Sequence, residues 1–69
     1  MQRTYGKLRE KIKTKYPTLK KFAEAMGIDS STLSLKLNGA APWKQTEIEI
    51  ACQLLNIPVI EIGEYFFYN

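Results

Sequence analysis

Proline and glycine divide this chain into short blocks, and within each block the apolar residues recur at steps of three and four. The dividing residues are Pro17, Gly27, Gly39, Pro42 and Pro58. Steps of three and four place side chains on one stripe of an α-helix, whereas a half-buried strand alternates apolar and polar residues. Because 69 residues can build only one compact core, the sequence predicts a single all-α domain of five helices spanning residues 1–69.

The first two blocks predict a pair of helices separated by Pro17. The two apolar stripes are Tyr5, Leu8, Ile12 and Tyr16, then Leu19, Phe22, Ala23 and Met26. A residue before proline is pushed out of the helical region, so the first helix ends there. The Thr18 hydroxyl can cap a second helix over residues 19–26, and Gly27 can adopt the left-handed conformation that ends it.

A third helix follows after a tight glycine-containing turn. Asp29 or Ser30 can cap it, and it runs over residues 30–37. The side chains expected to anchor it to the core are Leu33 and Leu37. Two short helices joined in this way form a helix-turn-helix unit.

The remaining blocks predict two more helices. One covers residues 45–55, for which Thr46 and Glu49 have the spacing of a capping box, although Lys44 could be the true start. Pro58 suits the first turn of the fifth helix. Its expected apolar set is Val59, Ile62, Tyr65 and Phe66.

Charge is distributed unevenly along the chain. Residues 1–36 carry nine lysines and arginines against three acids, whereas residues 37–69 carry one lysine against four glutamates. This asymmetry favours one face that meets a polyanion and another kept away from it. A lysine-rich helix face can also be simply solvated, or can meet an acidic protein.

Composition argues against catalysis. No histidine occurs, which excludes imidazole acid/base chemistry, histidine-ligated zinc and a Ser-His-Asp triad. Cys52 is the only cysteine, and its place in an apolar pattern favours a small buried hydrophobe. We therefore expect no enzyme activity, no cofactor and no metal. Without an apolar stretch for a signal peptide or a membrane span, a bacterial host's cytoplasm is the expected location, with no membrane partner.

Three runs of residues resemble a known family. They are FAEAMGI at residues 22–28, LSLKLNG at 33–39 and ACQLLNI at 51–57. These runs resemble Cro and cI (Xre-type) helix-turn-helix regulators, and the LSLKLNG and IGEYFF blocks are similar to short Cro-like or repressor-modulator proteins of phages of Gram-positive hosts. The resemblance covers nearly the whole chain and implies a lambda repressor-like fold that binds an operator as a dimer.

The resemblance also implies two sets of DNA contacts. The base-facing positions are Ser30, Ser31 and Leu35, and the backbone-contacting positions are Thr18, Lys20, Lys21, Thr32, Lys36 and Lys44. Either serine could instead cap the third helix. The outward positions before Asn38 lack arginine, glutamine and asparagine, which are the strong bidentate readers of bases. Leu35 could contact a thymine methyl or dock against another protein.

The chain ends with a run of aromatic residues. It consists of Tyr65, Phe66, Phe67 and Tyr68. Four consecutive side chains on a helix cannot all face one small core, so part of the run is expected to form a dimer or partner contact. Alternatively, Tyr65 and Phe66 complete the core while Phe67 and Tyr68 lie along the surface.

The sequence therefore predicts a sequence-specific DNA-binding transcriptional regulator, a phage Cro-like repressor whose partner is double-stranded operator DNA. Because one fold can serve several functions, a second hypothesis stands beside it. In that hypothesis the chain is an anti-repressor, or modulator, that binds a phage repressor protein and blocks its DNA-binding surface.

Overall fold

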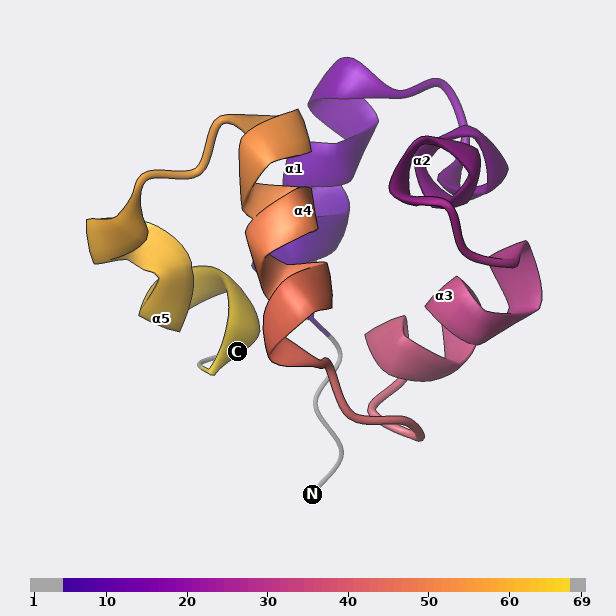
Figure 1. The fold of residues 1–69 in the computed structure, drawn as a ribbon. Helices are drawn as coiled ribbons and strands as arrows, with labels where there is room; N and C mark the ends of the chain where they lie inside the picture. Colours follow the sequence, from indigo (N-terminus) through magenta and orange to yellow (C-terminus); the bar gives the residue numbers. More distant parts are fainter. Residues whose placement is uncertain (1–4, 68–69) are drawn as a thin grey trace.

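The computed structural model describes residues 5–67 and contains helices but no strand in that range (Figure 1). The elements are α1 (Gly6–Lys15), α2 (Leu19–Met26), α3 (Ser30–Leu37), α4 (Gln45–Leu55), the 3-10 helix η1 (Val59–Glu61) and α5 (Ile62–Phe66). The prediction of a compact all-α fold with five α-helices is confirmed.

Helix α4 lies at the centre of the fold. It packs against α1 and α2, while α1 also packs against α5. Figure 1 shows α5 on one side of α4 and the α2–α3 pair on the other. The largest fully buried side chains come from all five helices and are Leu8, Ile12, Phe22, Leu33, Leu37, Leu55 and Phe66. Each such side chain contributes about 1.5–3 kcal/mol when it leaves water, which makes this shared core the main source of stability.

Both ends of α2 are closed by local hydrogen bonds. The Thr18 hydroxyl accepts a bond from the Lys21 backbone N–H at 3.1 Å. Gly27 has a φ of 79°, and the following Ile28 N–H donates to the Ala23 carbonyl at 3.0 Å. This left-handed closure turns the chain sharply and brings α3 against α2.

Asp29 caps α3, which decides between the two candidates that the sequence left open. Its carboxylate accepts hydrogen bonds from the Ser31 hydroxyl and from the Ser31 backbone N–H, the latter at 3.0 Å. These two bonds to Ser31 lower the pKa of the Asp29 carboxyl. The Ser31 hydroxyl is therefore hydrogen-bonded within the chain, while Ser30 lies exposed in the first turn.

The start of α4 differs from the predicted capping box. The Glu47 carboxylate, and not that of Glu49, accepts a bond from the helix start, where the Lys44 N–H donates at 2.9 Å. Lys44 is the N-cap residue, so the reciprocal partner lies three residues later at Glu47. The pairing of Thr46 with Glu49 was wrong because the helix begins earlier than that pairing requires.

The segment after Pro58 also differs from its prediction. The chain makes a single 3-10 turn, closed by a 2.9 Å bond from the Glu61 N–H to the Pro58 carbonyl, before α5 begins at Ile62. A 3-10 turn has three residues instead of 3.6, so an α-helical stripe does not continue through it. Val59, which was expected to face the core, is 84% exposed.

Replacing Gly27 by alanine should lower the free energy of unfolding by about 1 kcal/mol, because an L-residue resists the left-handed conformation. No atom lies within 4 Å of the added Cβ, so the loss comes from the backbone alone. Thermal unfolding followed by circular dichroism should show that the midpoint temperature of unfolding falls by roughly 4–8 °C. Gly27→Asn is the matched control. It should lose less stability than Gly27→Ala, since asparagine tolerates the left-handed conformation better than alanine does. An equal loss in both variants would contradict this account.

Candidate partner-binding surface

The outward face of α3 presents small hydroxyls and one apolar side chain. Ser30, Ser31, Ser34 and Leu35 are exposed on it, Leu35 to 50%. None of these side chains carries a guanidinium or an amide. The face can therefore contact a partner through van der Waals contact and weak polar bonds, but it lacks groups that read base edges bidentately.

Most residues predicted to contact the DNA backbone do reach the surface. Lys20, Lys21 and Lys44 are exposed, and Thr32 is half-buried. The Thr18 hydroxyl is exposed too but already accepts the capping bond at the start of α2. The lysines of α2 thus form a basic face, and its role in binding stays a prediction.

Lys36 was predicted to contact the DNA backbone, and the structure contradicts this. Its side chain is only 5% exposed, and its ammonium lies 2.8 Å from Glu47 Oε1. The same group donates to the Pro42 carbonyl at 2.9 Å. Because a buried ammonium with two internal partners cannot reach a phosphate, Lys36 instead connects α3 to the start of α4.

The Glu47 carboxylate remains ionised in this half-buried place. Burial raises the pKa of the Glu47 carboxyl, but the hydrogen bond from Lys36, the Lys44 N–H and the positive charge of Lys36 outweigh it, so the pKa is lowered overall. A carboxyl whose pKa falls on folding contributes stability above its unfolded pKa and loses it as pH falls through the folded value. The ion pair is therefore formed at neutral pH.

Arg9 holds the other end of α3. Its guanidinium donates to the Leu37 carbonyl at 3.1 Å and to Asn38 Oδ1 at 2.8 Å. A cation at a helix C-terminus also complements the partial negative charge of the last carbonyls. Helix α3 is consequently fixed by Asp29 at its start and by Arg9 at its end.

The C-terminal aromatic run divides between core and surface. Tyr65 and Phe66 are buried, and the Phe66 ring packs edge-on against Trp43 at 5.1 Å between centroids. They cannot serve as the predicted dimer or partner contact, because their surface is already covered within the fold. Phe67 is 53% exposed, and Tyr68 lies outside the described residues.

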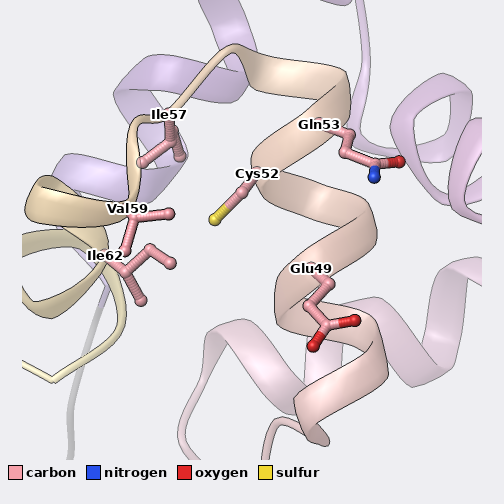
Figure 2. Close-up of a pocket in the computed structure, with 6 residues that line it drawn as sticks. All are labelled: Glu49, Cys52, Gln53, Ile57, Val59 and Ile62. Carbon is pink, nitrogen blue, oxygen red and sulfur yellow. The ribbon is translucent and has the colours of Figure 1, made fainter.

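An open apolar groove lies between α4 and the segment containing η1 and the start of α5 (Figure 2). It encloses about 330 Å³, and its lining residues are Glu49, Cys52, Gln53, Ile57, Val59 and Ile62. Figure 2 shows the Cys52 side chain pointing from α4 toward Val59 and Ile62 on the opposite wall. We call this feature the α4–η1 groove.

The α4–η1 groove was not predicted from the sequence. Val59 was expected in the core and Ile60 had no expected role, yet these are the most exposed large apolar side chains of residues 5–67, at 84% and 89%. The charge distribution was the one sequence feature that pointed to a distinct surface in this part of the chain. Residues 45–69 contain four glutamates and neither lysine nor arginine.

Cys52 is a wall of the groove and not a reactive centre. Burial raises the pKa of the Cys52 thiol, which keeps it protonated and poorly nucleophilic at neutral pH. Across residues 5–67 the acidic side chains and Cys52 form no cluster that could hold a metal ion. Within the same range, no helix is long and apolar enough to cross a membrane.

Comparisons with known proteins identify relatives of this chain. The model of the family described as "Protein of unknown function (DUF739)" matches residues 1–69. No curated protein matches. Among solved structures, the chain is similar to the modulator of repression (MOR) of the temperate bacteriophage TP901-1 from Lactococcus lactis, at 42% sequence identity and a TM-score of 0.84. That alignment covers 97% of this chain and 90% of the phage protein.

This likeness overturns the prediction of a Cro-like DNA-binding repressor. The similar phage protein is named as a modulator of repression, and the matching family is described only as a protein of unknown function, so membership of the Cro and cI class is not confirmed. The geometry agrees with the correction, because Lys36 is sequestered by Glu47 and the Ser31 hydroxyl is used by Asp29. Helix α3 therefore lacks both a central cation and a strong base-reading side chain.

Replacing Lys36 by alanine should lower the free energy of unfolding by about 3 kcal/mol at pH 7, because it leaves the Glu47 carboxylate half-buried without its cation. Urea unfolding followed by tryptophan fluorescence provides the measurement.

The matched control is Lys21→Ala, which breaks the exposed pair with Glu24 and should cost less than about 1 kcal/mol. Glu47→Gln should additionally flatten the loss of stability below about pH 4.5. Equal losses for Lys36→Ala and Lys21→Ala would refute the structural role of Lys36.

Proposed function

The chain belongs to the DUF739 family, and we propose that it is a modulator of repression, a phage-encoded protein that binds a repressor protein and blocks the repressor's DNA-binding surface. The observation that carries this proposal is the likeness to the lactococcal phage modulator along nearly the whole chain.

The described surface supports a binding protein. Large apolar side chains are exposed at Leu35, Val59, Ile60 and Phe67. Exposed apolar patches on a small protein mark contact sites for other macromolecules. As proposed here, the protein acts by contact alone, without catalysis or a cofactor, in the host cytoplasm where repressor and operator meet.

The proposed mechanism is competition. A repressor molecule whose DNA-reading surface is covered cannot bind its operator, so the modulator removes repressor from the DNA by mass action. When free modulator exceeds its dissociation constant about 100-fold, the repressor's apparent operator affinity falls by about the same factor. The effect depends on the free concentrations of both proteins, so a modest excess of either one can decide whether the operator is occupied.

Adding this protein to a complex between the repressor of the same phage and a fluorescent operator duplex should release the DNA, because this protein and the DNA compete for one repressor surface. Fluorescence anisotropy at physiological salt measures the release. Without the repressor, this protein should leave the duplex's anisotropy unchanged, and an unrelated repressor bound to its own operator is the control for specificity. Tight binding of the operator by this protein alone, with the repressor complex unaffected, would contradict the proposal.

A further inference from the structure

The α4–η1 groove is flanked by exposed apolar side chains, and covering them with a partner lowers the free energy of the system. Val59 and Ile60 stand almost fully in solvent, and Val59 also forms one wall of the groove. Burial of one such side chain contributes about 1.5–3 kcal/mol. A groove of about 330 Å³ is at the lower end of the size range of small-molecule pockets. Its openness suits a protruding side chain of another protein.

Charge around the groove is negative and partly unneutralised. Of the four glutamates in residues 45–69, Glu47 and Glu64 form ion pairs with Lys36 and Lys7. Within residues 5–67, the other two glutamates, Glu49 and Glu61, form no ion pair. Glu49 lines the groove and Glu61 belongs to η1. The Glu49 carboxylate accepts a hydrogen bond from the Gln45 side chain at 3.2 Å but has no cationic partner in the described part of the chain. Two carboxylates without an ion pair, one in the groove and one on η1, favour a partner that is both cationic and apolar.

The side of α4 opposite the groove carries exposed lysines. They are Lys20 and Lys21 on α2, of which Lys21 pairs with Glu24. In Figure 1 the α2–α3 pair and the η1–α5 segment lie on opposite sides of α4. Any surface that reads DNA is itself cationic, because it must neutralise phosphates. The lysine-rich side therefore repels such a surface, and the glutamate-rich side attracts it.

We propose that the DNA-reading surface of the repressor docks on the α4–η1 groove, and not on the face of α3. An apolar side chain of the repressor enters between Cys52 and Val59, Ile60 covers adjacent apolar surface, and basic side chains that otherwise contact phosphates pair with Glu49 and Glu61. This assignment rests on the function proposed above. It also explains why a helix-turn-helix fold with a weak reading helix keeps a separate apolar surface exposed.

The test compares variants of the two faces by isothermal titration calorimetry with the full-length repressor of the phage that encodes this protein. The groove variants are Val59→Ser with Ile60→Ser, and Glu49→Lys with Glu61→Lys. The matched controls on the other side are Leu35→Ser, and Lys20→Glu with Lys21→Glu. Val59 and Ile60 are more than four-fifths exposed, so their replacement should leave the thermal unfolding temperature unchanged.

Each groove variant should weaken repressor binding at least tenfold, while Leu35→Ser should change it less than threefold. The assignment is overturned if wild-type protein binds the repressor and the groove variants bind equally well; the proposed function then survives, and loss of binding in Leu35→Ser moves the contact to α3. Absence of wild-type binding overturns both. Conversion of a wild-type dimer to monomers by the groove variants, with repressor affinity unchanged, also overturns the assignment and makes the groove a self-association site.

Discussion

The ion pair between Lys36 and Glu47 connects the helix-turn-helix to the rest of the molecule. Lys36 reaches from α3 to the Pro42 carbonyl and to the carboxylate of Glu47, which in turn accepts the N-cap N–H of α4. One lysine thereby orders the loop, the helix start and the third helix together. A charge pair in a largely buried place is stable only when both partners have further hydrogen bonds, as they do here. The same contact removes from α3 the cation that a DNA-reading helix needs, so a single interaction bears on both fold and function.

The two sides of α4 differ in their charge. Helix α2 presents Lys20 and Lys21, whereas Glu49 of α4 lines the α4–η1 groove and Glu61 belongs to η1. In the proposed docking on a repressor's cationic surface, electrostatic complementarity accelerates encounter and excludes the wrong orientation. Burial of Val59 and Ile60 would then supply affinity that salt does not screen. In the proposed function, a small helical scaffold opposes DNA binding by a repressor instead of binding DNA itself.

Several local features were readable directly from residue types. The cap at Thr18, the left-handed Gly27 and the apolar stripe of α2 are observed where the pattern placed them, because capping and helix periodicity act within a few residues. Prediction was weaker where two local solutions had similar energies, as at the start of α4. The groove was missed because its walls come from α4 and from a 3-10 turn that breaks the helical repeat, and no helical pattern describes such a turn.

By itself, the sequence determined the all-α class, the ends of α2, the buried identity of residues such as Leu8 and Leu33, and the uneven distribution of charge. These properties depend on composition and on neighbours one or two helical turns away. Tertiary structure alone decided that Lys36 is buried, that Tyr65 and Phe66 belong to the core, and that Val59 and Ile60 stand in solvent. The physical reason is that the exposure of a side chain depends on which other elements pack over it, and that packing brings together residues distant in the chain, such as Trp43 and Phe66.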